Sequence, residues 1–151
     1  MAAAAIDGCG SPAPSVPEAI PATLGPLVTP GPQSLDCEFL LSRAEVEQWL
    51  HARVEQVRVS YGDTAGGAGC QYQTAMGAGY VTIFTGPAAE QMWSNRPAGT
   101  PGPPGPVEIN VVDGAPVGHL LGRWVTVRGQ AFDGLALATR IELVELLAGR
   151  L

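Results

Sequence analysis

Apolar and polar side chains alternate most clearly in the segment VEQVRVSYG, which spans residues 54–62. One face of an extended chain would carry Val57, Val59 and Tyr61, and the other Gln56, Arg58 and Ser60. A period of two is typical of a strand with one buried face. We therefore expect a half-buried strand here.

Four further segments have strand-like composition, namely CQYQTA, YVTIFTG, VEINVVDG and GRWVTVRGQ. In the last of them, Val125 and Val127 would face one way and Trp124 and Thr126 the other. The segment DGAPVGHLLG, which precedes it, is rich in turn residues, and we expect it to be a connection. The pattern predicts an antiparallel sheet of about five strands.

A strong helix start lies in the segment CEFLLSRAEVEQWLHARV. Ser42 and Glu45 have the spacing of a capping box, and Leu41 and Val46 can form a hydrophobic staple across it. We expect a helix over residues 43–52. A second, short helix is expected in PAAEQMWSN, with its proline at the first helical position.

The last segment, FDGLALATRIELVELLAGRL, permits two readings. As a helix it would have Asp133 as its N-cap and an apolar face of Leu137, Ile141, Val144 and Ala148. As a strand over residues 139–145 it would make the last fifty residues resemble a small OB-like barrel. Its length favours the helix. The predicted class is α+β, an antiparallel sheet packed by an N-terminal and a C-terminal helix, in a single domain over residues 35–151.

The first 34 residues have a different composition, rich in proline, alanine, glycine and serine, and we expect a disordered tether. Within them, DGCGSPAPS resembles a bacterial lipobox, in which the cysteine receives diacylglycerol. Gly8 and Cys9 match this pattern, whereas Asp7 departs from it. The alternative is a free cysteine in a tail. No segment has 18 consecutive apolar residues, so membrane attachment is expected only through Cys9.

The net charge of the chain and the positions of its arginines limit the kinds of partner that we expect. The chain has a net charge of −6, with eight arginines and no lysine. The arginines are scattered, so there is no basic stripe to neutralise phosphates, and nucleic-acid binding is not expected. The missing lysine, with abundant alanine, glycine, valine and arginine, is typical of a GC-rich bacterial genome such as that of an actinobacterium.

The chain has three cysteines. If Cys9 carries lipid, Cys37 and Cys70 remain and can pair, and such a bond would persist only in an oxidising compartment. The alternative is two buried free thiols in a cytosolic domain. There is no CxxC motif, and the only histidines that could serve as further metal ligands are His51 and His119. Neither a metal site nor a cofactor is therefore expected.

The helix start and the second cysteine together resemble a family of actinobacterial lipoproteins of unknown function, to which the extracellular sensor domains of some mycobacterial Ser/Thr kinases look related. The matching positions are Cys37, Leu40, Leu41, Ser42, Glu45, Cys70 and Tyr72. The resemblance implies a disulfide between the two matching cysteines, a cell-surface location and an α+β domain. It implies no catalytic residue.

We therefore expect a non-enzymatic lipoprotein domain, anchored to the outer face of the cell membrane, that binds a small apolar ligand, an envelope component or a protein partner. The possible ligand face comprises Trp49, Tyr72, Trp93, His119 and Trp124. An alternative is an envelope hydrolase that uses His119 within hydrogen-bond reach of Asp113 or Asp133. A third hypothesis is an OB-like interaction module, which requires the C-terminal strand.

Overall fold

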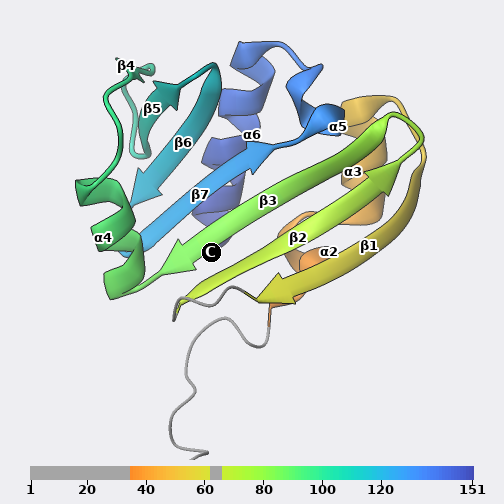
Figure 1. The fold of residues 1–151 in the computed structure, drawn as a ribbon, viewed down its shortest axis with the longest axis horizontal. Helices are drawn as coiled ribbons and strands as arrows, with labels where there is room; N and C mark the ends of the chain where they lie inside the picture. The colour runs from red at the N-terminus through yellow and green to blue at the C-terminus, as the bar shows by residue number, and fades with distance from the viewer. Residues whose placement is uncertain (1–34, 62–65) are drawn as a thin grey trace, which may run out of the picture. The chain divides into compact units, whose positions relative to one another are not determined.

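A computed structural model describes residues 35–61 and 66–151. The described residues form an α+β fold with a seven-stranded sheet, in the order β1-β2-β3-β7-β6-β5-β4 (Figure 1). Every strand pair is antiparallel. The elements are α2 (Cys37–Leu40), α3 (Arg43–Leu50), β1 (Val54–Tyr61), β2 (Gly67–Thr74), β3 (Gly77–Thr85), α4 (Pro87–Ser94), β4 (Thr100–Pro101), β5 (Glu108–Val112), β6 (Ala115–Leu120), β7 (Arg123–Arg128), α5 (Gln130–Asp133) and α6 (Leu137–Arg150).

The sheet is thus larger than the five strands expected from the sequence. The additional strands are β4, which has only two residues, and β6, which lies in the segment expected to be a connection. The strand β6 is hard to recognise from the sequence because it contains Pro116 and Gly118, and both residue types are depleted in strands. In the folded chain β6 lies between β5 and β7, so the pairing of its neighbours creates it.

One face of the sheet holds the main core and is covered by helices α2, α3, α5 and α6 (Figure 1). Alternation along β3 and β7 places Val81, Ile83, Val125 and Val127 on this face, fully or almost fully buried. Tyr72 of β2 lies among them and is also fully buried. The alternation expected for β7 is confirmed, since Val125 and Val127 share this covered face.

The C-terminal segment is a helix, which confirms the helical reading and removes the strand that an OB-like module would need. The N-cap of α6 is Ala136, whereas Asp133 belongs to the separate short helix α5. The buried face comprises Leu143, Val144, Leu147 and Ala148. Leu137, which the sequence placed on that face, is 40% exposed. Leu137 therefore lies off the buried face of α6.

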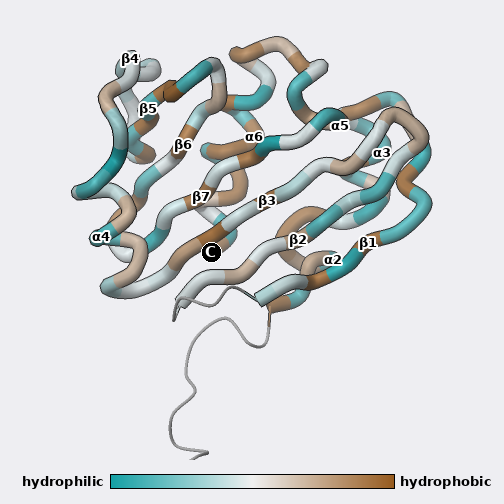
Figure 2. The backbone as a smooth tube through the Cα atoms, in the orientation of Figure 1, coloured by the Kyte–Doolittle hydropathy of each residue, from teal (hydrophilic) through white to brown (hydrophobic). Residues whose placement is uncertain are grey.

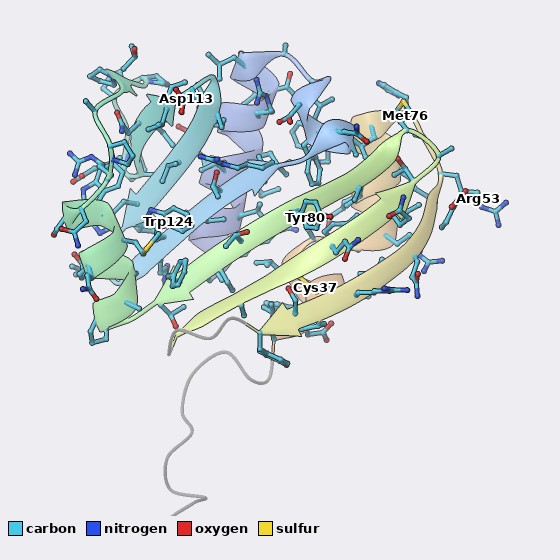
Figure 3. All side chains as sticks on the ribbon, in the orientation of Figure 1. Cys37, Arg53, Met76, Tyr80, Asp113 and Trp124 are labelled. Atoms are coloured by element: carbon cyan, nitrogen blue, oxygen red, sulfur yellow. A yellow bond between two sulfur atoms is a disulfide. The ribbon has the colours of Figure 1, made fainter. Side chains whose placement is uncertain are left out.

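The opposite face of the sheet is covered only in part. Helix α4 packs beside β3 and β7, and its Ala89 forms a small second core with Val117 and Trp124. Within residues 35–61 and 66–151, no helix covers β1, β2 and the adjoining part of β3 on this side (Figure 1). Figure 2 shows hydrophilic residues recurring along β1 and β2, and Figure 3 shows the side chain of Tyr80 on this open face.

Cys37 and Cys70 form a disulfide, as the family resemblance implied. It joins α2 to the second strand across 33 residues of sequence, and both cysteines are buried. The hydroxyl of Tyr72, nearby on the same strand, donates a hydrogen bond of 2.6 Å to the carbonyl of Leu41. Burial raises the pKa of this phenol. The hydroxyl therefore keeps its proton and donates this hydrogen bond at neutral and mildly alkaline pH. The junction between α2 and α3 is thus fixed to the sheet.

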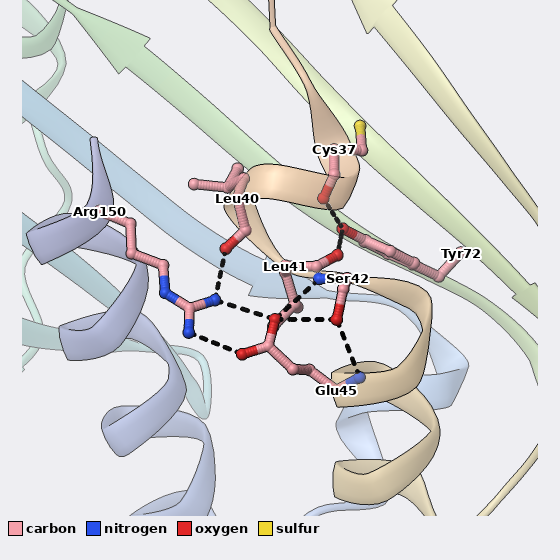
Figure 4. A network of polar contacts seen from close by, with 7 residues as sticks. All are labelled: Cys37, Leu40, Leu41, Ser42, Glu45, Tyr72 and Arg150. Carbon is pink, nitrogen blue, oxygen red and sulfur yellow. Dashed lines mark hydrogen bonds and ion pairs between the residues drawn. The ribbon is translucent and has the colours of Figure 1, made fainter.

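A polar network extends from the same junction to the last helix (Figure 4). Ser42 and Glu45 form the predicted capping box. The Glu45 carboxylate also accepts two hydrogen bonds from Arg150, at 2.6 and 3.0 Å. Arg150 donates a further bond to the carbonyl of Leu40. One arginine therefore links α6 to both N-terminal helices of the domain.

This network predicts a loss of stability in acid. Hydrogen bonding from Arg150 is the main reason why the pKa of Glu45 falls from 4.5 to about 2. Because the folded-state pKa is depressed, the stabilisation is complete above pH 4.5 and is lost as the pH falls towards 2. Glu45→Gln should lower the free energy of unfolding by about 1–2 kcal/mol at pH 7, a value reduced for solvent screening because the side chain is 33% exposed. Urea unfolding of both proteins should show the difference shrinking towards zero near pH 2. A difference independent of pH would contradict this assignment.

Candidate functional site

The open part of the sheet presents a row of polar side chains that runs across four strands. The register pairs Arg58 with Gln71, Gln71 with Tyr80, and Tyr80 with Arg128. These four residues belong to β1, β2, β3 and β7 in turn, so the row crosses the strands at right angles to the chain direction. Gln56 and Gln73 form a second pair beside it. We call these six residues the polar row.

Strand alternation explains why the polar row forms. On β2, Gln71 lies between the buried residues Cys70 and Tyr72. On β1 the face opposite the row is less covered than the sequence suggested, since Val57 is half-buried and Val59 is 42% exposed. A shallow hollow of about 280 Å³ lies over β1 and β2 and is lined by four members of the row, Gln56, Arg58, Gln71 and Gln73. The polar row is therefore an accessible surface with a shallow hollow at one end.

The polar row carries positive charge in a protein of net charge −6. Its two ionised groups are the guanidinium groups of Arg58 and Arg128, and both side chains are exposed. Neither arginine forms an ion pair with any residue that the structure describes. The row itself contains no carboxylate. Both cations are thus available to an anionic group from outside the domain.

A second cluster lies under α4 on the same side of the sheet, and it contains His119. The imidazole stacks on the ring of Trp93, with centroids 4.9 Å apart. Its Nε2 lies 3.1 Å from Glu90, and its Nδ1 lies 3.7 Å from Glu108. The guanidinium of Arg96 lies 3.9 Å from the centre of the same tryptophan ring.

The His119 cluster holds α4 on the sheet. Glu90, in the first turn of α4, also accepts a 2.6 Å hydrogen bond from the backbone N–H of Gly122. This bond, and then the bond with His119, lower the pKa of Glu90. The carboxylate is therefore committed to two partners on the turn and strand beneath it. A structural role in docking the helix explains the geometry.

The carboxylates near His119 are not the two expected from the sequence. Asp113 lies at the turn between β5 and β6, where it has a positive φ of 51°. Asp133 is 3.5 Å from Arg140, with which it forms an ion pair. The predicted pairing of His119 with Asp113 or Asp133 is therefore wrong, because the β5–β6 turn and helix α5 place these aspartates elsewhere.

The five residues of the expected ligand face do not share one surface. Trp93, His119 and Trp124 come together under α4. Tyr72 is fully buried in the core on the other side of the sheet. Trp49 lies on α3, half-buried, where it lines a groove of about 510 Å³ together with residues of α6. The sequence identified aromatic side chains but not the face that each one would occupy.

The structure also bears on metal and membrane sites. Within residues 35–61 and 66–151, no three His, Cys, Asp or Glu side chains are grouped so that they could hold a metal ion. Over the same residues, no helix is long and apolar enough to cross a membrane. Cys9, the expected lipidation site, and the expected tether lie outside the described residues.

The fold and the polar row define an α+β domain with one covered and one partly open sheet face. No protein-family model matches the chain. No curated protein matches it either. Among solved structures, it is similar to a GTP binding regulator from Thermotoga maritima, with 17% sequence identity and a TM-score of 0.36, over 74% of this chain and 88% of that chain. At this TM-score we carry no property of that protein over to this chain.

Proposed function

We propose that this protein is a non-enzymatic lipoprotein of the cell envelope that binds an envelope component through the polar row. The observation that supports the binding role is the sheet face over β1, β2, β3 and the end of β7, which no described helix covers. On it, Arg58 and Arg128 form no ion pair with another described residue. An apolar face of a sheet must be covered, whereas a polar one can stay in contact with water. A polar, cationic face favours an envelope component or a protein over the small apolar ligand considered from the sequence.

The Cys37–Cys70 disulfide supports a location outside the cytoplasm, because such bonds persist in oxidising compartments. The lipobox-like segment at Cys9 and the resemblance to actinobacterial lipoproteins also support a location outside the cytoplasm. The binding role needs no acid–base pair. The polar row offers amides, guanidinium groups and a phenol, which are suited to recognition.

The localisation can be tested by intact mass. The gene, with its upstream region, should be expressed in an actinobacterial host, and the membrane fraction weighed before and after reduction. We expect a diacylglycerol increment on Cys9 and a gain of about 2 Da on reduction, as two thiols form from one disulfide. A chain without lipid in the soluble fraction would overturn the envelope assignment.

The binding role can be tested by sedimentation with purified cell walls of the same host. Arg58→Glu combined with Arg128→Glu should weaken binding by tenfold or more, since each lost charge-assisted contact is worth about 1.5 kcal/mol or more. Arg43→Glu combined with Arg53→Glu makes the same change in net charge at exposed positions outside the row. If both double variants sediment like the original protein, the polar row is not the binding surface.

A further inference from the structure

We infer that the ligand of the polar row is an extended, polyhydroxylated chain, such as a glycan, that carries widely spaced anionic groups. This inference rests on the proposed function, and it specifies the chemistry of the envelope component.

The spacing of the two arginines sets the length of the ligand and the distance between its charges. Arg58 and Arg128 are separated by three inter-strand intervals, through Gln71 and Tyr80. At about 4.8 Å for each interval, their Cα atoms lie roughly 14 Å apart. Side chains stand roughly perpendicular to a sheet, so the two guanidinium groups project from well-separated points and do not converge on one small anion. A chain laid across the strands can place one anionic group near each.

The residues between and beside the arginines match hydroxyl groups. A glutamine amide both donates and accepts hydrogen bonds, as does a sugar hydroxyl. Three glutamines, Gln56, Gln71 and Gln73, lie together at one end of the row, and with Arg58 they line the 280 Å³ hollow. This end can therefore hold a ring with several hydroxyl groups.

Tyr80 supplies a different kind of contact in the middle of the row. Its side chain is 45% exposed on the open face, so part of the flat ring is available for stacking and the phenol can reach a polar partner (Figure 3). A sugar ring has both an apolar C–H face and a polar edge. One exposed ring between two sets of polar groups suits such a mixed surface.

The sparse charge separates this ligand from a nucleic acid. A nucleic-acid strand carries one phosphate about every 3.4 Å, and proteins that hold single strands use several stacked aromatic rings. The polar row has two cations roughly 14 Å apart and one tyrosine. The net charge of −6 would also repel a densely charged chain. The surface therefore fits a chain that is mostly neutral.

The inference is tested with two matched probes and the full chain, with its disulfide intact. One probe is a hyaluronan decasaccharide, which has a carboxylate on every second sugar, and the other is the same oligosaccharide with its carboxyl groups reduced to alcohols. Titration by calorimetry should show binding of the acidic probe and at least tenfold weaker binding of the reduced one. Backbone amide shifts by NMR should map to β1, β2, β3 and β7.

Matched variants identify the contacts. Arg58→Gln combined with Arg128→Gln should weaken binding of the acidic probe by tenfold or more, to the level of the reduced probe, and should abolish most of its salt dependence. Arg43→Gln combined with Arg53→Gln loses the same charge outside the row and should leave binding unchanged. Both pairs of side chains are exposed, so each variant should fold, and its amide spectrum checks this.

The outcomes separate this inference from the proposed function. Equal binding of the two probes, with no effect of the Arg58/Arg128 variant, would overturn the anionic character of the ligand. Failure of both probes, while the cell-wall sedimentation still depends on the polar row, would overturn the glycan inference and leave the proposed function standing. Failure of both assays would remove both.

Discussion

The double variant Cys37→Ala/Cys70→Ala should lose about 4 kcal/mol of unfolding free energy. The reason is the length of chain that the bond closes. A cross-link between residues 33 apart removes much of the conformational freedom of the unfolded chain. The loss should be comparable to that of a large core truncation, and the buried contacts of both cysteines add to it.

Urea unfolding of the chain produced without lipid measures this loss, with Cys9→Ala as the matched control because it then removes a thiol and keeps the disulfide. The original protein in excess reductant should approach the stability of the double variant. A loss below about 1 kcal/mol would mean that the folded domain owes little to the cross-link.

The second large effect is expected at Gly118, where α6 approaches β6. A methyl group at this position would lie 2.4 Å from Cγ1 of Val144, well inside van der Waals contact. Both elements are buried here, so neither can move away without opening the core. Gly118→Ala should therefore lower the free energy of unfolding by about 1–3 kcal/mol, and Gly118→Leu by more.

A double-mutant cycle tests the cause. Val144→Ala removes the group that an alanine at position 118 would meet, so the combination of Gly118→Ala and Val144→Ala should be less destabilised than the sum of the single changes, by about 1 kcal/mol or more. Gly149→Ala is the matched control, because a Cβ there would meet no heavy atom within 4 Å. Simple additivity in the cycle would show that the contact is not the source of the loss.

Local signals in the sequence predicted the local structure well. The Ser42–Glu45 capping box and the alternation along β7 are present as expected, since each depends on residues close together in the chain. The strand β6 could not be recognised in this way. Its composition is unfavourable, and it is stabilised by β5 and β7, which pair with it on both sides.

The candidate site depended on longer-range information. The polar positions Gln56 and Arg58 were visible in the alternation of the first strand, but a polar strand face is ordinarily just solvated. Which part of the sheet stays open is decided by the packing of α4 through Glu90 and His119, which are 29 residues apart. The partners of His119 were missed for the same reason. Short motifs give no information about which carboxylates a fold brings to a histidine.

The ion pair between Glu45 and Arg150 has a consequence for the order of events in folding. Its partners are 105 residues apart, and the helices that cover the main core come from both the beginning and the end of the domain. A nascent chain that has produced the sheet but not α6 would have no cover for the apolar faces of β6 and β7. Contacts between distant parts of a chain also slow folding. The core over β6 and β7 is therefore completed only when α6 has been synthesised, and until then this part of the sheet exposes apolar surface that can aggregate.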